Sequence, residues 1–181
     1  MNEQFNKLLD IIATSMQQIE GKYFNFKVAN NEEPISRERV FCAELYHQMR
    51  NMFDELNYDL NNEPNKKSHP IIEEECGAVD PDFIVHRIGS MGPDDNLAVI
   101  EVKTSRGNLT DGIEKDMQTI NCMCSIDNGY YGGIVIIFGD LTDKKKENLI
   151  RRITQIKSKA LNRFAIIFQS VPETEPEIIE L

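Results

Sequence analysis

Two charged side chains stand in an otherwise apolar stretch of the sequence. Glu101 and Lys103 lie within 97–104, and the alternation of a β-strand places both on the same face. A carboxylate among apolar neighbours is costly unless it is paired with a cation or binds a metal ion. Lys103 alone can supply the pairing, so these two residues by themselves favour an ion pair on a half-exposed strand.

A second carboxylate, Asp82, follows Pro81 at the start of the preceding predicted strand, 82–88. If the two strands are neighbours in a sheet, Asp82 reaches the same edge as Glu101, and two carboxylates converge with one ammonium group. Oxygen ligands of this kind suit Mg²⁺ or Mn²⁺, which take one or two protein carboxylates and keep several waters. Asp80 competes for the same role, since Asp80, Pro81 and Asp82 also make good turn sequence.

The elements that must position these residues follow from hydrophobic periodicity and from turn residues. Helical spacing of apolar residues predicts helices at 3–20, 36–56, 110–125 and 143–161, with Ser36 as the N-cap of the second. Short runs rich in β-branched residues predict strands at 71–79, 82–88, 97–104, 134–138 and 164–171, and 57–69 is expected to be an exposed loop. The first three strands are expected to form an antiparallel meander.

The bulk composition fits one folded domain. The chain has 181 residues, of which 40% are hydrophobic, enough to bury one substantial core. We expect a single domain over 1–172, with an N-terminal helix and extension at 1–30, a core at 36–171 and an acidic tail at 173–181.

The sequence also bears on location and on the thiols. No apolar run is long enough to span a bilayer, and the first residues lack the basic and apolar pattern of a secretory signal, so a cytoplasmic protein without membrane contact is expected. Cys42, Cys76, Cys122 and Cys124 form no Cys-x-x-Cys pair and are expected to be reduced.

The formal charge of −10 argues against a protein that coats nucleic acid, because such binding relies on Lys and Arg. It leaves room for a nuclease, since a bound metal and one basic face can supply a local positive field. Lys145, Arg152 and Lys159 recur at intervals of seven and are candidate phosphate contacts, as are Lys66 and Lys67. A solvated surface explains both groups about equally well.

Taken together, Pro81-Asp82, then Glu101-Val102-Lys103, with Glu44 on the preceding long helix, resemble the PD-(D/E)xK nuclease superfamily, which includes the restriction endonucleases. The resemblance covers roughly residues 36–139. It implies an α/β fold with a restriction-endonuclease-like core, in which helices flank a mixed central β-sheet. The short motifs are degenerate, so the specificity lies in their conjunction. The same pattern favours Asp82 over Asp80, because Asp82 directly follows the proline.

The resemblance also assigns roles. It implies that Asp82 and Glu101 are metal ligands together with the backbone carbonyl of Val102, and that Lys103 positions or helps to deprotonate the attacking water. Glu44 would complete the catalytic set, directly or through water. Gln118 resembles an accessory glutamine found in some branches of the superfamily.

The expected function is therefore that of a Mg²⁺-dependent (or Mn²⁺-dependent) endonuclease that hydrolyses phosphodiester bonds in DNA by attack of metal-activated water. Specificity would then come from loops, from a homodimer or from a partner protein. Two alternatives stay open. One is a catalytically silent nuclease-like module that binds or assembles within a larger DNA-processing or defence complex. The other is a metal-dependent phosphodiesterase that acts on nucleotides or RNA.

Overall fold

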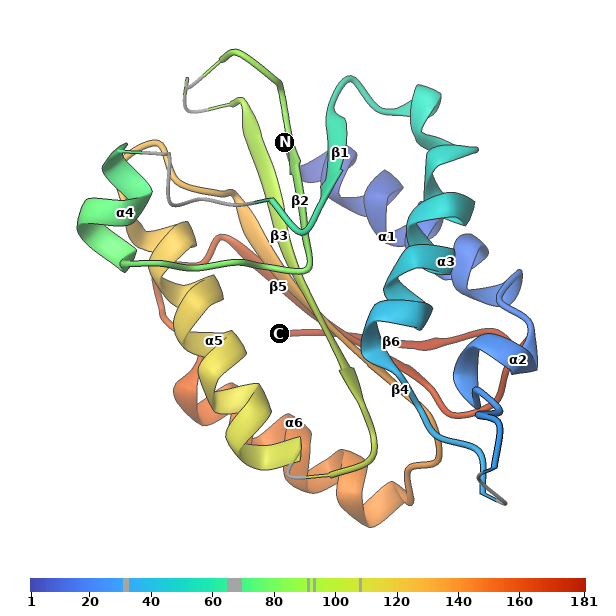
Figure 1. Cartoon of the computed structure of the whole chain (residues 1–181). Coiled ribbons are helices and arrows are strands. Elements are labelled where there is room, and N and C mark those ends of the chain that lie inside the picture. Colours follow the sequence, from blue (N-terminus) through green and yellow to red (C-terminus); the bar gives the residue numbers. More distant parts are fainter. Residues whose placement is uncertain (31–32, 65–69, 91, 93, 108) are drawn as a thin grey trace.

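A six-stranded mixed sheet with helices on both faces forms the protein (Figure 1). The computed structural model describes residues 1–30, 33–64, 70–90, 92, 94–107 and 109–181. The fold is α/β, as the sequence predicts. None of the helices in these ranges is long and apolar enough to cross a membrane.

The strands are arranged in the sheet in their order along the chain. They are β1 (Asp59–Asn62), β2 (Phe83–His86), β3 (Asn96–Thr104), β4 (Gly132–Phe138), β5 (Arg163–Gln169) and β6 (Glu177–Glu180). β1, β2 and β3 form an antiparallel meander, β3, β4 and β5 run parallel, and β6 is antiparallel to β5. β3 is thus the strand at which the antiparallel and parallel halves of the sheet meet.

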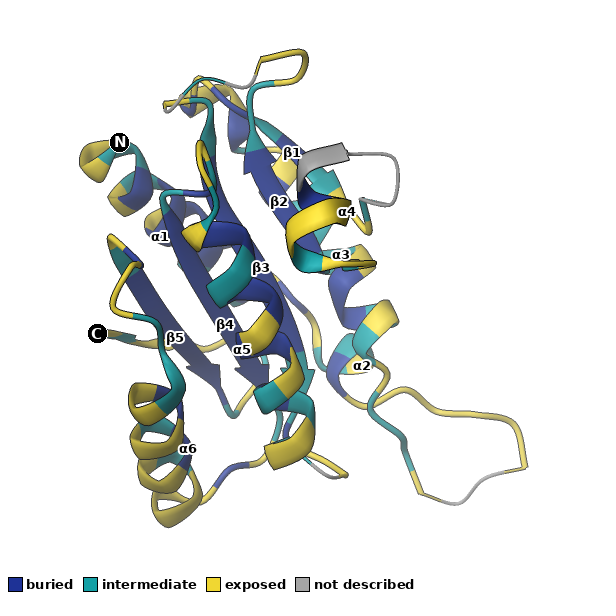
Figure 2. Ribbon diagram, turned by 90° about the vertical axis from the view of Figure 1, so that its left-hand side faces the viewer, coloured by how far each residue is buried: buried dark blue, intermediate teal, exposed yellow. Residues whose placement is uncertain are grey.

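Helices α1 (Asn2–Gln17), α2 (Gly21–Phe24) and α3 (Glu38–Arg50) cover one face of the sheet. Their apolar side chains pack with alternate residues of the strands, such as Ile100, Val102 and Phe138. Helices α4 (Pro70–Cys76), α5 (Leu109–Ser125) and α6 (Asp143–Ile156) cover the other face, where Val99, Val135 and Ile137 point. The central strands are consequently buried on both sides (Figure 2).

The structure corrects the expected strand at 71–79. Residues 71–76 of this segment belong to α4, and the first strand of the meander is β1, which lies within the stretch expected to be a loop. Pro70 suits the first turn of a helix, and Ile72 and Cys76 are one turn apart on the side that packs on α5. β1 was missed because only Leu60 is buried in an otherwise polar edge strand.

Several predicted ends also differ. α3 begins at Glu38 with Arg37, not Ser36, in the cap position, and it ends at Arg50, after which a 3₁₀ turn runs over Phe53–Glu55. α6 ends at Ile156, short of the predicted 161. Part of the segment expected as an acidic tail is β6, which pairs with β5 along its length.

The expectation of four reduced thiols is wrong for two of them. Cys76, at the end of α4, is disulfide-bonded to Cys122 on α5, whereas Cys42 and Cys124 are free and buried. Two cysteines that are remote in sequence and on separate elements give no spacing motif, so the pairing depends on how α4 packs on α5.

Candidate active site

The site lies where β2 and β3 separate. Their pairing runs as far as Phe83 and Ile100, and β3 then continues to Thr104. Side chains take the place of a neighbouring strand beside this extension. The amide of Val102 donates to Asp82 Oδ2 at 2.7 Å, and the amide of Thr104 donates to Glu38 Oε1 at 3.2 Å. Two backbone amides at this edge therefore hold two acidic side chains by hydrogen bonds.

Asp82 and Glu101 meet at this point and share a hydrogen bond between their carboxyl groups. Asp82 comes from the turn before β2, and Glu101 projects from β3 on the face covered by α5. Glu101 is only 5% exposed. The structure thus brings together the two carboxylates that the sequence predicted to converge.

Burial raises the pKa values of both carboxyl groups above their ordinary values. Burial, and after it the negative charges of Asp116 and Asp82, raise the pKa of Glu101 to about 9. Burial also raises the pKa of Asp82, although the Val102 amide and Lys103 oppose the shift. At neutral pH without a cation, Glu101 therefore holds a proton, which it donates in its hydrogen bond to the Asp82 carboxyl group.

Lys103 lies on the same face of β3 but is turned toward α5. Its Nζ is 3.0 Å from Asp116 Oδ2, 3.8 Å from Glu38 Oε2 and 3.3 Å from the Val102 carbonyl oxygen. Burial lowers the pKa of Lys103, but the charges of Asp116 and Glu38 outweigh that effect and the pKa is raised. Lys103 is therefore a fixed cation beside the carboxyl pair.

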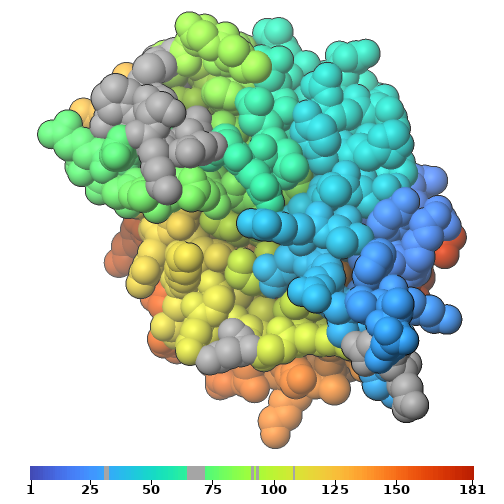
Figure 3. Space-filling view, in the orientation of Figure 1, coloured from blue at the N-terminus to red at the C-terminus, as the bar shows by residue number. Residues whose placement is uncertain are grey.

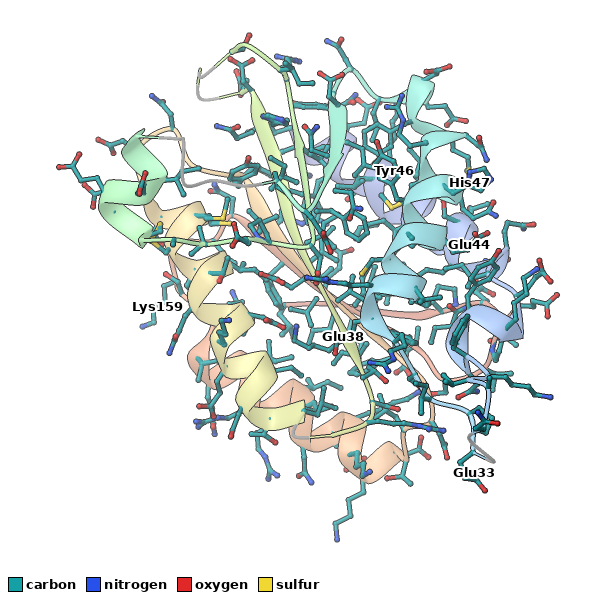
Figure 4. The ribbon with its side chains drawn as sticks, viewed as in Figure 1. Glu33, Glu38, Glu44, Tyr46, His47 and Lys159 are labelled. Carbon is teal, nitrogen blue, oxygen red and sulfur yellow. A yellow bond between two sulfur atoms is a disulfide. The ribbon has the colours of Figure 1, made fainter. Side chains whose placement is uncertain are left out.

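Glu44 is not part of this cluster. Its carboxylate accepts a hydrogen bond of 2.7 Å from Gln48 on the same helix, and its charge acts on Lys22 of α2. Glu38, at the start of α3, is the helical acid that reaches β3. In Figure 4 Glu38 lies at the end of α3 nearest β3 and Glu44 lies farther along the helix. Of these two acids of α3, the structure thus places Glu38, and not the predicted Glu44, beside β3.

A cavity of about 470 Å³ opens beside these residues. Asp82, Glu101, Lys103 and Asp116 line it, and so does Gln118, the predicted accessory residue. Its outer wall is the end of α4 and the segment after it, which lie next to α5 on the face shown in Figure 3. The remaining polar lining includes Asp80 and Lys115, so the cavity carries more acidic than basic groups.

Two residues of this cluster were missed from the sequence. Asp116 carried a signal, because it lies on the buried stripe of its helix with Ile113, Met117 and Ile120, yet it is charged. A charged residue on such a stripe needs a partner, which here is Lys103. Glu38 carried no comparable signal, because its contact with β3 depends on where α3 begins.

The candidate nucleic-acid contacts that the structure describes, Lys145, Arg152 and Lys159, do not line the cavity beside the carboxyl pair. Arg152 Nε donates to Glu114 at 2.9 Å on the outer side of α5 and α6. Lys145 lines a separate cavity with Ser105 and Thr110, and Lys159 is exposed beyond the end of α6. Lys66 and Lys67 lie outside the described residues. The three described cations therefore do not form one helical face.

The carboxyl pair offers oxygen ligands, which are the kind that a hydrated divalent cation binds. Two carboxyl groups close enough to share a proton are close enough to share an ion with ligand distances near 2.1 Å. Among the described residues, no group of three or more His, Cys, Asp and Glu side chains is placed to hold a metal ion. A cation here would depend on Asp82, Glu101, backbone oxygen and water.

A scan against protein-family models, a search of curated proteins and a search of solved structures each found no match.

Proposed function

We propose that the protein is a Mg²⁺-dependent phosphodiesterase of the restriction-endonuclease-like class, which hydrolyses DNA with water as the nucleophile. The observation that carries the proposal is the Asp82–Glu101 carboxyl pair, placed with Lys103 on one face of β3 and open to a cavity. A pair of buried acids that must hold a proton in the absence of a cation is a site in which a cation can replace that proton.

The order of elements supports the proposal. α3, β1, β2, β3, α5 and β4 follow one another as helix, three strands, helix and strand, and α4 is inserted between the first two strands. This is the order that the resemblance to the PD-(D/E)xK superfamily implies. Asp82 precedes the second strand, and Glu101 and Lys103 lie on the third.

The residues divide the chemistry between them. A bound cation supplies Lewis-acid activation of water and neutralises charge on the phosphate. Asp82 and Glu101 would hold that cation, and the Asp82 carboxylate is itself oriented by the Val102 amide. Lys103 would direct its ammonium group to the phosphate or to the attacking water, within the cavity beside Glu101. Neither role requires a covalent intermediate on the protein.

Cleavage of supercoiled, linear, branched and single-stranded DNA in the presence of Mg²⁺ or Mn²⁺ tests the proposal. Wild type should cleave at least one substrate, and chelation should abolish cleavage. Glu101→Gln and Lys103→Met should each lower the rate by at least about 100-fold, because each removes a group that acts directly in the reaction.

Glu38→Gln and Glu44→Gln provide a matched pair on one helix. Glu38 contacts Lys103 and the Thr104 amide, so its loss should slow cleavage, whereas the loss of Glu44 should leave the rate within about twofold. Absence of cleavage together with absence of Mn²⁺ binding by the wild type would contradict the proposal and favour a silent binding or assembly module. Cleavage of RNA or nucleotides alone would replace DNA as the substrate.

A further inference from the structure

Asp116 is a buried carboxylate whose nearest charged partner is Lys103. It lies on α5, is 5% exposed and approaches the Lys103 Nζ to 3.0 Å. We infer that Asp116 is a positioning residue: it anchors the Lys103 ammonium group beside the carboxyl pair rather than between its members, so that Glu101 and Asp82 stay available to a divalent cation. This inference rests on the metal site of the proposed function and extends it to a residue of the neighbouring helix.

The shape of α5 supports the inference independently of charge. Gly112 lies one helical turn before Asp116, and a Cβ atom placed on it would be 3.4 Å from Cε and 3.5 Å from Cδ of Lys103. The aliphatic chain of Lys103 therefore runs closely past Gly112, and its ammonium group ends at Asp116. One turn of α5 thus contacts both the stem and the head of the same lysine.

The alternative partners of Lys103 show why a dedicated acid matters. Glu38 is farther away, at 3.8 Å, and its side chain is 38% exposed. The proposed ligands Asp82 and Glu101 are also acids, and they line the same cavity as Lys103. An ammonium group without Asp116 would be attracted to those two carboxylates and would oppose the binding of a cation between them.

Removal of Asp116 has two separable effects on metal affinity. It removes one negative charge near the cation, which weakens binding whether or not Lys103 is present. It also frees Lys103 to compete for the ligands, and this second effect requires Lys103. A double-mutant cycle isolates the second effect, because only a residue that acts through Lys103 changes its influence when Lys103 is removed.

The experiment measures the Mn²⁺ dissociation constant of wild type, Asp116→Asn, Lys103→Met and the double variant, with the full chain and no DNA. In the wild-type background Asp116→Asn should weaken Mn²⁺ binding at least about tenfold more than it does in the Lys103→Met background. Asp116→Glu, which restores the charge, should recover part of the loss. Glu114→Gln, on the outer side of the same helix, should change affinity less than about twofold in both backgrounds.

The outcomes separate the inference from the proposed function. An equal loss in both backgrounds, or no loss, would overturn the positioning role and leave the proposed nuclease intact. Absence of Mn²⁺ binding by the folded wild type would overturn the metal site and the inference together. Mn²⁺ binding with the predicted cycle, but without cleavage of any nucleic acid, would support the inference and contradict the nuclease. Circular dichroism of each variant verifies that the substitutions leave the fold intact.

Discussion

Glu101 has the most perturbed environment among the side chains of the site. It projects from a strand that is buried on both faces, and burial together with two neighbouring acids raises its pKa to about 9 from an ordinary value near 4.5. Between those two pH values the folded protein binds a proton that the unfolded chain does not bind. The metal-free protein must therefore lose stability as pH rises through this window.

We predict that the free energy of unfolding, measured by urea titration in EDTA, falls as pH rises from about 5 to 9. For one proton the slope is at most about 1.4 kcal/mol per pH unit. Burial raises the pKa of Asp116 to about 6, so Asp116 adds to the slope only in the lower part of this range. Glu101→Gln should therefore flatten the profile above about pH 6, because the amide carries no proton that is lost there. Glu44→Gln should keep the wild-type slope. A profile of Glu101→Gln that parallels the wild type would show that Glu101 is not the titrating group.

The sequence predicted which residues of the site come together wherever this depended on residues close in sequence or on paired strands. Glu101 and Lys103 share a face because strands alternate, and Asp82 meets them because β2 and β3 pair. Glu44 was selected in place of Glu38 because both lie on one predicted helix, and the contact with β3 is decided by the packing of α3. Asp116 requires the position of α5 on the sheet, which no local pattern supplies.

Among the elements, α5 positions the site because it packs unusually close to β4. Two glycines open β4 and face opposite layers. A Cβ atom on Gly132 would lie 2.5 Å from the Phe5 ring of α1, and one on Gly133 would lie 2.2 Å from Ile120 of α5. The absence of a side chain at Gly133 therefore sets the distance between α5 and the sheet, and with it the reach of Asp116 to Lys103.

Gly133→Ala should lower the free energy of unfolding by about 1–3 kcal/mol, because the added methyl group overlaps Ile120. The double variant Gly133→Ala/Ile120→Ala should be less destabilised than the sum of the two single changes, since the shortened residue 120 leaves room for the methyl group. Chemical denaturation of the four proteins measures this coupling. Strict additivity would mean that the contact with Ile120 does not limit the approach of α5.

The elements that the sequence predicted well are the ones buried on both faces or strongly amphipathic. β3, β4 and β5 and helices α1 and α5 fall close to their expected ranges. The edge strands β1 and β6 were missed because each is only four residues long and, with one side of an edge strand facing solvent, carries polar residues at both ends instead of a continuous apolar run. The short helix α4 was taken for a strand because seven residues give too little helical period to recognise.

For the molecule as a whole, the Cys76–Cys122 disulfide joins α4 to α5 across a sequence separation of 46. Removal of such a link by Cys76→Ser/Cys122→Ser should lower the free energy of unfolding by about 2–4 kcal/mol. Reduction of the wild type should produce a similar loss, measured by denaturation with and without dithiothreitol. The double variant should be insensitive to the reductant, and a wild type whose stability is also insensitive would contradict the link.

The position of this disulfide has a topological consequence. Asp82, Glu101, Lys103 and Asp116 all lie between the two bonded cysteines, so they belong to one covalently closed ring of the chain. A single break in the backbone of this ring, for example in the turn beside the exposed Ile88, would not release either half of the carboxyl pair from the other. Unfolded chains that keep the disulfide also begin refolding with these four residues already held within one closed loop of the chain. Glu38, by contrast, lies outside the ring and must reach the site from α3.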